Sequence, residues 1–375
     1  MADITRTLQE LRRGICSELR MPFFRRYVNG YSTIKTGSSA SLIKDTALTQ
    51  ADKFWNKMWF YHVPTQSISL IRAFQAQTDS FNLELPLESD PTVLDQYEIH
   101  SIWNAQDIKI AINRAIGAAN RTFPDSVSDK NTFVIKENNL TYSLSDLTKK
   151  PWLVNRIWIE SVPSVKRGTL VSASGSSATV ENSDILSDVE AGWLISIYSG
   201  TGIGQVRTIS GISGSQVNIS VNWATTPTST SKYAIWNPEY QLQDWYETPD
   251  FHTDSKEFPD TLYLHGRYPA SYGLRIRIEY LALDSDLSTE TDTTIIPKEY
   301  ITAKAISILY GQHMNNVKAD KDTAYALFKR YSDEADAYIA RNAPHMPDSI
   351  WRRPSEGEGL YLQENPLNWQ PNGGD

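Results

Sequence analysis

Cysteine is almost missing from this 375-residue sequence, which contains only Cys16. A single thiol excludes an internal disulfide and is typical of proteins that fold in a reducing compartment. Long apolar runs are missing as well: no run of about 18 apolar residues occurs, so we expect no membrane span. The N-terminal stretch MADITRTLQELRRG also lacks the apolar core of a secretion signal, which argues against export.

Familiar catalytic motifs are absent too. The sequence has no HExxH, CxxC or GxSxG pattern, and its six histidines show no pairing at metal-ligand spacing. His252 and His265 lie near Asp250 and Asp254, but lone histidines in aspartate-rich loops are common. We therefore predict no catalytic residue, no metal, no cofactor and a protein that is not an enzyme.

Two stretches imitate ligand-binding loops. Residues 200–204, GTGIG, suggest a phosphate loop, but they lead into a strand instead of a helix, which favours a hairpin loop. A second stretch has the alternating oxygen spacing of a calcium loop, although Thr289 and Ile295 replace the expected glycine and glutamate, so a solvated loop is favoured. The oxygen-bearing residues of this stretch are Asp284, Asp286, Ser288 and Glu290.

Acidic residues outnumber basic ones, 44 to 36, and the net charge is −8. We expect no general affinity for nucleic acid, because each phosphate contact requires a basic group. One basic cluster could hold phosphate, but a solvated or subunit-contacting face fits the overall charge better. Its members are Arg12, Arg13, Arg20, Arg25 and Arg26.

Four stretches have the apolar spacing of amphipathic helices. They cover residues 3–21, 104–122, 298–316 and 320–342. Asn104 is a natural N-cap, Pro297 suits an opening turn, and Asp320 or Asp322 can cap the last helix. Each helix alone is marginal in water, so we expect the four to bury their apolar faces in a common hub.

Two further stretches, 29–101 and 166–236, alternate in short runs broken by turn residues, as antiparallel strands do. They align with each other at an offset of 135 to 138 residues, which indicates a duplicated β-module. The aligned pairs are Gly37 with Gly175, Arg72 with Arg207, Pro91 with Pro227 and Tyr97 with Tyr233.

Strands are also expected in FVIKENNLTYSL, in LVNRIWIESV and around 262–264 and 274–280. The last of these alternates almost strictly, which predicts one buried face. Its other face would present Arg275, Arg277 and Glu279 outward.

These elements predict an α+β fold class: a discontinuous helical bundle with two inserted small antiparallel β-modules and an extended C-terminal arm. The predicted segments are bundle helices at 1–28 and 102–125, β-module 1 at 29–101, β-module 2 with flanking hairpins at 126–295, a C-terminal helical hairpin at 296–343 and the arm at 344–375.

The arm, 344–375, contains four prolines that forbid a helix, together with spaced apolar anchors. Disordered tails have few aromatic residues, so we predict an extended partner-binding segment, with a disordered tail as the alternative. The predicted partner-binding residues are Trp351, Arg352, Arg353, Leu360, Tyr361, Leu362, Leu367 and Trp369.

Residues 200–236, GTGIGQVRTISGISGSQVNISVNWATTPTSTSKYAIW, join a glycine-rich turn, GQ-x-R-x-I, a hairpin, a threonine/proline run and a closing strand with tyrosine. This combination resembles a pattern in virion proteins of tailed bacteriophages, and 41–100 looks like a degenerate copy. The last helix pair, opening with IIPKEYITAKAISILYG, is similar to the C-terminal helices of phage head-to-tail connector (neck adaptor) proteins.

The resemblance implies a structural virion protein of the neck, assembled in the host cytoplasm. Adaptors of this family form a twelve-fold ring below the portal protein, extend the DNA channel and give tail or nozzle proteins a docking surface. The helices would build the ring, the arm would reach the portal or a neighbouring subunit, and DNA would pass through without specific binding.

Two alternatives remain open. One is a tail, baseplate or fibre-associated virion protein whose β-modules bind a receptor or saccharide through aromatic side chains. The other is a carbohydrate-active enzyme, which requires two carboxylates facing one cleft about 5–10 Å apart. The cluster to test for it is Asp244, Glu247, Asp250 and Asp254.

Overall fold

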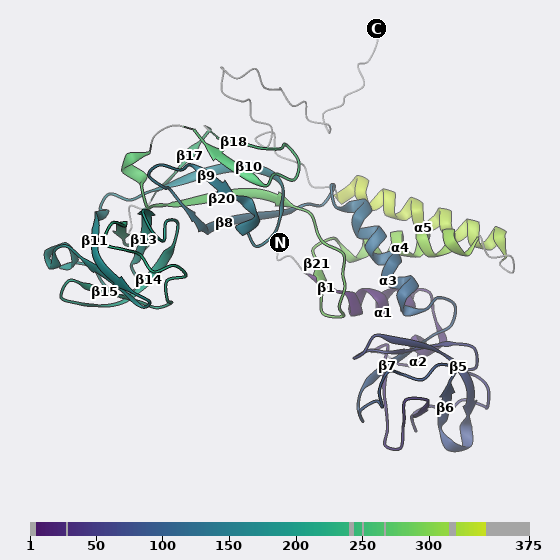
Figure 1. The fold of residues 1–375 in the computed structure, drawn as a ribbon. Helices are drawn as coiled ribbons and strands as arrows, with labels where there is room; N and C mark the ends of the chain where they lie inside the picture. The colour runs from purple at the N-terminus through teal and green to yellow at the C-terminus, as the bar shows by residue number, and fades with distance from the viewer. Residues whose placement is uncertain are drawn as a thin grey trace, which may run out of the picture. The chain divides into compact units, whose positions relative to one another are not determined.

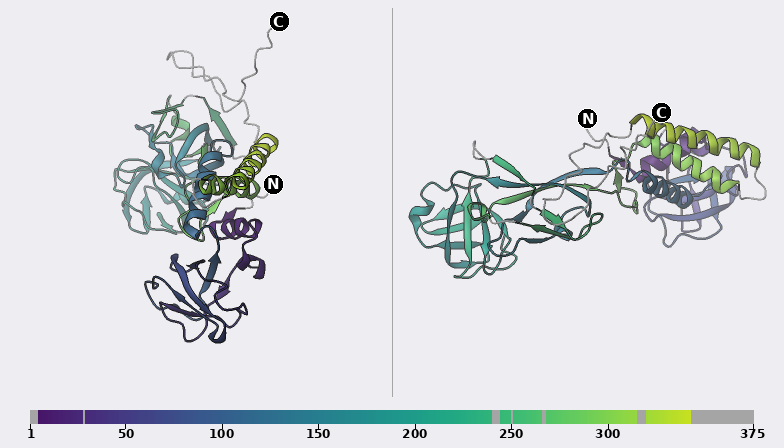
Figure 2. Two further views of the ribbon diagram at one scale, coloured as in Figure 1. Left: turned by 90° about the vertical axis from the view of Figure 1, so that its right-hand side faces the viewer. Right: turned by 90° about the horizontal axis from the view of Figure 1, so that it is seen from above.

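The computed structural model describes residues 5–27, 29–239, 244–249, 251–265, 268–314 and 320–342 (Figures 1 and 2). The chain forms two compact units. Unit 1 combines Met1–Pro124 with Asp284–Pro344, and unit 2 contains Asp125–Leu283. Unit 2 is therefore inserted into the sequence of unit 1.

Unit 1 combines helices from both ends of the chain with one sheet. Its helices are α1 (Leu8–Glu18), α2 (Pro22–Arg26), α3 (Ala105–Ala119), α4 (Lys298–His313) and α5 (Lys321–Asn342). The strands of its six-stranded sheet are β2 (Ser32–Thr33), β3 (Leu42–Lys44), β4 (Trp59–His62), β5 (Ser67–Gln75), β6 (Ser80–Leu83) and β7 (Gln96–His100), and the 3₁₀ turn η1 is Ala76–Thr78. A separate pair, β1 (Arg6–Thr7) with β21 (Thr293–Thr294), lies next to the start of α1.

Local side-chain chemistry explains where the helices begin. α1 opens with a capping box, in which Thr7 Oγ1 accepts from Glu10 N and Glu10 Oε2 accepts from Thr7 N, each at 3.1 Å. α3 begins after the expected N-cap Asn104, whose side chain accepts from Asp107 N at 2.8 Å. These helices are shorter than the predicted stretches because their caps lie inside them.

The last two helices, α4 and α5, lie side by side in both views of Figure 2. Asp320 Oδ1 accepts from Thr323 N at 3.3 Å, so Asp320 caps α5 as predicted. Of the 22 residues of α5, only Ala324, Tyr331 and Ala335 are buried. The outer side of this helix therefore remains exposed.

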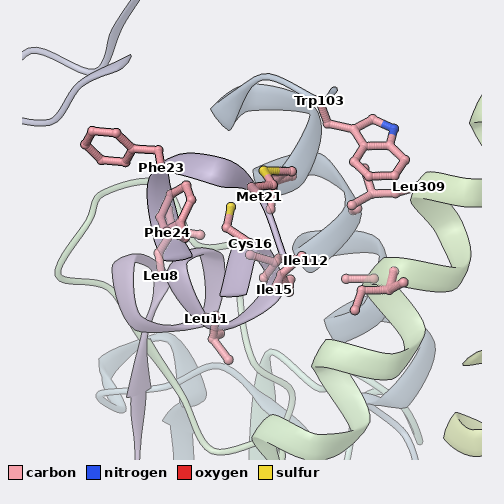
Figure 3. Close-up of a cluster of buried hydrophobic side chains, with 14 of the residues drawn as sticks. Leu8, Leu11, Ile15, Cys16, Met21, Phe23, Phe24, Trp103, Ile112 and Leu309 are labelled. Carbon is pink, nitrogen blue, oxygen red and sulfur yellow. The ribbon is translucent and has the colours of Figure 1, made fainter. Parts of the chain in front are cut away.

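One large hydrophobic core joins the helices of unit 1 to its sheet. Figure 3 shows part of this core, in which Leu8, Leu11 and Ile15 of α1 belong to one buried cluster with Ile112 of α3 and Leu309 of α4. On the sheet side the core includes the stacked rings of β4 and β7 and the aromatic residues around them. Burying one large apolar side chain contributes about 1.5–3 kcal/mol as an upper estimate, so this core accounts for much of the stability of unit 1.

The sheet of unit 1 curls into a half-open barrel. Its strand order is β2-β7-β4-β5-β6-β3, all antiparallel, with β2 and β3 at the two edges. Residues in or next to the two edge strands contact each other without forming a ladder. Lys35 N donates to Lys44 O at 3.0 Å, and Ser32 Oγ donates to the buried carboxylate of Asp45. Tyr97 Oη donates to the same carboxylate at 2.6 Å.

Unit 2 contains a closed six-stranded barrel. Its strands are β11 (Lys166–Ser174), β12 (Ser177–Val180), β13 (Leu194–Ser199), β14 (Val206–Ser213), β15 (Gln216–Ile219) and β16 (Lys232–Trp236), with the 3₁₀ turn η3 at Ser183–Leu186. Around the barrel the order is β11-β12-β15-β14-β13-β16, and β16 returns to β11. Apolar side chains from all six strands or the loops beside them fill its interior.

The two barrels have the same topology. Unit 1 reads β3-β6-β5-β4-β7-β2, and unit 2 reads β12-β15-β14-β13-β16-β11, which follows the offset found in the sequence. Registers agree as well: Trp59 is opposite His100 in unit 1, as Leu194 is opposite Trp236 in unit 2. The difference is closure, because only the second copy has a ladder between its two edge strands.

The rest of unit 2 is a second pair of sheets. The four-stranded sheet has the order β17-β10-β20-β8, and the three-stranded sheet has the order β18-β19-β9. Their strands are β8 (Asp125–Val134), β9 (Thr141–Ser143), β10 (Pro151–Ser161), β17 (Asp244–Thr248), β18 (Phe251–Thr253), β19 (Thr261–Leu264) and β20 (Arg275–Ala282), with the 3₁₀ turns η2 (Leu144–Asp146) and η4 (Pro269–Ser271). The two sheets share a core of their own, which includes Ile157, Ile278 and Leu262.

A buried carboxylate holds the four-stranded sheet against the barrel within unit 2. Glu160 of β10 is fully buried, and its two oxygens accept from Arg275 at 2.7 and 3.1 Å. Glu160 Oε1 also accepts from Trp236 Nε1 of the barrel at 3.1 Å. The prediction that Arg275 points outward is therefore wrong, because it pairs with a carboxylate on the neighbouring strand.

The predicted fold class is wrong. The described residues are mostly β-structure, with five sheets, one of them a closed barrel and another a half-barrel, and the helices form a minority. A discontinuous helical bundle with two inserted small antiparallel β-modules does not describe this chain, and the predicted extended C-terminal arm, 344–375, lies outside the described residues. The error arose because residues 125–161 and 275–282 pair across more than 100 residues of sequence, and short polar strands give only weak local patterns.

Candidate functional site

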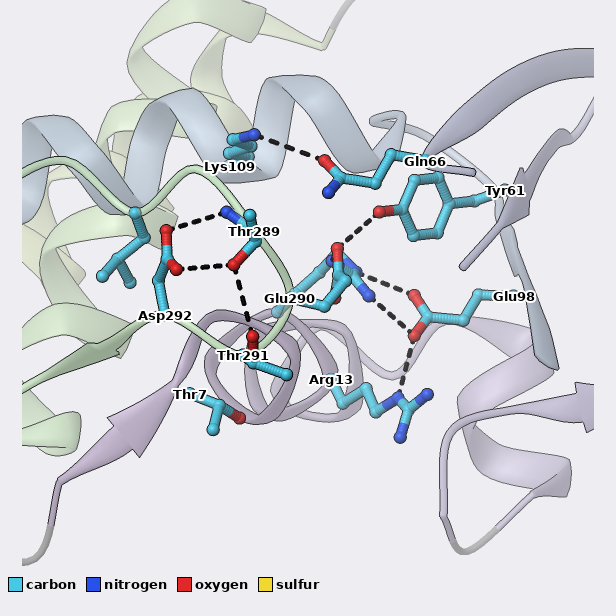
Figure 4. A network of polar contacts seen from close by, with 12 residues as sticks. Thr7, Arg13, Tyr61, Gln66, Glu98, Lys109, Thr289, Glu290, Thr291 and Asp292 are labelled. Carbon is cyan, nitrogen blue, oxygen red and sulfur yellow. Dashed lines mark hydrogen bonds and ion pairs between the residues drawn. The ribbon is translucent and has the colours of Figure 1, made fainter. Parts of the chain in front are cut away.

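A buried polar network lies between α1, β7 and the loop that precedes β21 (Figure 4). Arg12 donates to both oxygens of Glu98, at 2.8 and 2.9 Å, and to Glu290 Oε1 at 2.7 Å. Arg13 Nε also donates to Glu98 Oε1 at 2.8 Å, and Tyr61 Oη donates to Glu290 Oε1 at 2.5 Å. The network therefore ties three distant parts of unit 1 together.

Charge pairing decides the protonation of this network. Burial alone would raise the pKa of Glu98, but the Arg12 charge and hydrogen bonds from His100 and Arg12 hold that pKa well below its usual range. Burial would likewise lower the pKa of Arg12, but Glu98 and Glu290 hold it above its ordinary value. Arg12 and Glu98 are thus a charged pair with almost no exposure to solvent.

The same network contains a thiol, an imidazole and a carboxylate in line, as a cysteine nucleophile and its base would be. Cys16 Sγ lies 3.5 Å from His100 Nδ1, and His100 Nε2 lies 3.1 Å from Glu98 Oε2. All three side chains are fully buried, and burial raises the pKa of Cys16 and lowers that of His100. A sealed, protonated thiol beside a neutral imidazole cannot meet a substrate, so this arrangement holds α1 against β7.

An open groove of about 540 Å³ lies on the other side of α1. It contains three basic side chains, those of Arg6 on β1, Arg13 on α1 and Lys298 at the first residue of α4. The remaining residues that line it are Glu10, Gly14, Ser17, Asn29 and Tyr31. We refer to this cavity as the α1 groove.

Arg13 is held in the α1 groove by its neighbours. Its guanidinium lies 4.6 Å from the centre of the Tyr31 ring and donates to Gln96 Oε1 at 3.1 Å. Arg6 and Lys298, by contrast, form no ion pair with any residue in the described ranges. The α1 groove is therefore a basic site suited to an anionic group.

The residues predicted to bind a partner lie outside the described part of the chain. They are Trp351, Arg352, Arg353, Leu360, Tyr361, Leu362, Leu367 and Trp369. The basic cluster near the N-terminus does not form one surface: Arg12 is buried in the ion pair, Arg13 is shared between the network and the α1 groove, and Arg25 is exposed on α2.

The two stretches that resemble ligand-binding loops have structural roles. Residues 200–204 join β13 to β14, which pair antiparallel, so the predicted hairpin loop is confirmed. In the calcium-like stretch, Asp284 Oδ2 accepts from Thr294 Oγ1 at 2.6 Å and Ile295 N at 3.0 Å, while Glu290 binds Arg12. These carboxylates stabilise the loop instead of surrounding a common point.

The acidic cluster proposed for glycoside chemistry is only partly described. Asp250 and the side chain of Asp244 lie outside the described residues, and Asp254 Oδ1 accepts from the backbone N–H groups of Asp260 and Thr261. Nearby, His252 and His265 stack at 4.6 Å, and His252 Nδ1 lies 2.5 Å from His265 Nε2. Within the described ranges, no group of three or more histidine, cysteine or acidic side chains could hold a metal ion.

Sequence reasoning missed the partners of Arg12 and the α1 groove. Glu98 and Glu290 are separated from Arg12 by 86 and 278 residues, so no local spacing connects them. Two local signals were available for the groove: a glycine, Gly14, inside an amphipathic helix, and a lysine, Lys298, at the start of another.

Comparison with known proteins identifies no relative of this chain: no family model, no curated protein and no solved structure matches it. Among the helices of the described residues, none is both long and apolar enough to cross a membrane.

Proposed function

We propose that this chain is a structural virion protein, a head-to-tail adaptor that forms a ring below the portal, extends the DNA channel and docks tail components. The proposal starts from the resemblance of residues 200–236 to virion proteins of tailed bacteriophages and of the last helix pair to phage neck adaptor proteins. The observation that carries it furthest is the long exposed side of α5, which a ring of identical subunits would cover.

The exposed side of α5 presents one large aromatic residue among charged residues. Tyr325 is 56 % exposed in the single chain. Tyrosine is enriched at protein interfaces, so this side chain is a candidate contact with a neighbouring subunit. Charged residues of both signs, among them Lys329, Arg330 and Glu334, are exposed on the same helix. A mixed surface of this kind gives a neighbouring copy both apolar area and complementary charges.

The polar network supports a scaffold role. A ring repeats one contact between identical subunits, so the elements of each subunit need fixed relative positions. In unit 1, Arg12 joins β7 and the loop before β21 to α1 through buried ion pairs. Such pairs give weak net stability but define one geometry.

Mass photometry of the purified chain with the portal ring of the same phage tests the proposal. We expect particles heavier than the portal ring by a fixed multiple of 42.4 kDa, the mass of one chain. Tyr325→Ala should lower the occupancy, whereas Val221→Ala, a substitution of another exposed apolar residue, should not. The absence of any stoichiometric complex would exclude the adaptor function.

A second candidate function is a tail- or fibre-associated protein that binds saccharide. It is favoured by two half-buried indole rings on the four-stranded sheet, Trp158 and Trp245. The guanidinium of Arg277 lies 4.8 Å from the first ring centre and 5.6 Å from the second. Aromatic platforms with a nearby hydrogen-bond donor suit sugar rings, so binding to a glycan array that is lost in Trp158→Ala would support this function.

A further inference from the structure

The α1 groove has the charge of an anion site. Arg6, Arg13 and Lys298 face its one acidic residue, Glu10, and a carboxylate oxygen of Glu10 already accepts from Thr7 N in the capping box. Arg6 and Lys298 are half-buried and form no ion pair with a described residue. Two partly desolvated cations without counter-charges attract an anion strongly.

Two local preferences are broken at this groove. Gly14 stands in the middle of α1, where glycine costs roughly 1 kcal/mol relative to alanine. Lys298 stands at the first residue of α4, where the helix dipole disfavours a cation. Unfavourable choices of this kind concentrate at functional sites.

The two broken preferences are connected by geometry. A Cβ built on Gly14 would lie 3.1 Å from Lys298 Cε and 3.5 Å from Lys298 Nζ. Glycine at this position therefore lets the Lys298 side chain lie across α1 and bring its ammonium group into the groove. In addition, Pro297 at the N-cap of α4 provides no side-chain cap, so the first amide groups of α4 favour a nearby anion.

The chain itself contains a fitting anionic segment. Residues 355–364, SEGEGLYLQE, contain three glutamates and no lysine or arginine. Glu356 and Glu358 are two positions apart in the sequence, the spacing that places side chains on one side of an extended strand, and glycine separates them. Glu356 follows Asn342, the last described residue, by 14 residues, a span of up to about 50 Å when extended.

We propose that the α1 groove binds the segment 355–364 of a second copy of this chain. Glu356 and Glu358 pair with Lys298 and Arg6, and the contact links neighbouring subunits head to tail. The inference rests on the proposed ring, because a heterologous contact of this kind closes into a ring when it is repeated.

Site-specific photo-crosslinking in the full chain tests the proposal. A benzophenone amino acid replaces Ser17, which is exposed at the rim of the groove, in an equal mixture of ¹⁴N- and ¹⁵N-labelled protein. We expect crosslinks to residues 355–364 in peptide pairs of mixed label. Crosslinks in same-label pairs only, crosslinks to residues 1–4 instead, or none at all would overturn the assignment.

Charge reversal identifies the contact. Arg6→Glu with Lys298→Glu, or Glu356→Lys with Glu358→Lys, should each lower the crosslink yield about tenfold, and the four changes together should restore it. Asp348→Lys with Asp375→Lys, the same charge change elsewhere in the C-terminal region, is the matched control and should leave the yield unchanged. Loss of yield in the control, or no rescue, would contradict the pairing.

Gly14→Ala separates binding from folding. The added methyl group should raise the thermal stability of α1 but displace Lys298 and lower the crosslink yield. An unchanged yield would show that Lys298 does not act through this position and would overturn the groove geometry. Portal binding is measured separately: a chain that binds portal without the crosslink refutes only this contact, and one that crosslinks but never binds portal refutes the adaptor function.

Discussion

The guanidinium of Arg12 and the carboxylate of Glu98 are joined by two hydrogen bonds of 2.8 and 2.9 Å, with 1 % and 0 % of the side chains exposed. The pair connects the first helix to a strand 86 residues later. A charge in this position is tolerated only while its partner is present, because an unpaired buried ion loses its hydration without compensation.

Glu98→Gln should therefore destabilise unit 1 by about 3–5 kcal/mol, the usual cost of breaking a buried pair. Glu290→Gln is the matched control, since Glu290 also pairs with Arg12 but its side chain is 14 % exposed, and its cost should be smaller. Urea unfolding, with hydrogen exchange of the α1 amides to identify the affected unit, measures both. Equal effects would show that burial does not decide the cost.

Stability should fall as the solution becomes acidic, in two steps. Burial lowers the pKa of His100 below its ordinary 6.5, so below about pH 6.5 the unfolded chain binds a proton that the folded chain resists, and stability is lost. The pKa of Glu98 is also lowered, so its contribution is present above about pH 4.5, the ordinary value, and is lost as the pH falls further.

The loss of stability caused by histidine protonation can be measured separately from the loss caused by Glu98. Burial also lowers the pKa of His62, so the double variant His62→Gln/His100→Gln should have an unfolding free energy that changes less between pH 7 and pH 5 than that of the wild type. Urea midpoints collected across this range supply the comparison. An equally steep decline in the double variant would assign the step to other groups.

The duplicated barrels offer a matched pair of tyrosines. Tyr97 Oη donates to the buried Asp45 at 2.6 Å, whereas the buried Tyr233 hydroxyl has no hydrogen-bond partner within the described residues. Tyr97→Phe should cost about 1–3 kcal/mol, because Asp45 loses a donor, and Tyr233→Phe should be nearly neutral. Thermal unfolding of the two variants distinguishes them, and a larger loss for Tyr233→Phe would contradict the assignment.

Alanine substitutions at three glycines distinguish the effects of helix propensity, backbone strain and steric clash on stability. Gly117→Ala, on the exposed side of α3 with no atom within 4 Å of the new Cβ, should stabilise unit 1 by about 1 kcal/mol. Gly214 and Gly273 both have positive φ, but only at Gly273 does a new Cβ collide, at 2.4 Å from the Ala234 Cβ. Gly273→Ala should therefore lower the melting temperature more than Gly214→Ala does, and the reverse order would contradict the packing around Gly273.

The predicted partner anchors are testable without deleting the arm. Trp351→Ala and Trp369→Ala should each weaken the complex with the portal by about tenfold, because buried tryptophans commonly dominate interface energies. Neither change should alter the melting temperature of the chain if the arm serves only partner binding. A lower melting temperature with unchanged portal affinity would assign these residues to the fold.

Helix starts were predictable from the sequence because their causes are local. Asn104 and Asp320 cap helices through residues three positions away, so the pattern and its physical reason lie within one turn. The hairpin at 200–204 was predictable for the same reason, since the glycines and the following strand are adjacent. The duplicated strand order was visible because two copies within one chain repeat the same alternation.

The fold class and the polar network were not predictable in this way. β10 pairs with β20, more than a hundred residues later, and nothing near Ile157 indicates that Ile278 will be its partner. Arg275 was expected outside because alternation identifies a face but not what covers it, and the carboxylate of Glu160 decides the outcome. Arg12 was grouped with other arginines by position, although its environment depends on Glu98 and Glu290.

The insertion of unit 2 into unit 1 determines the order in which the chain can fold during synthesis. The first 124 residues leave the ribosome without α4 and α5, whose apolar residues complete their core. Translation of the intervening 159 residues takes roughly 8 to 30 seconds, enough for the second barrel to close first. During that interval the nascent N-terminal helix exposes its apolar side, which makes it a natural client for chaperones until the last helices emerge.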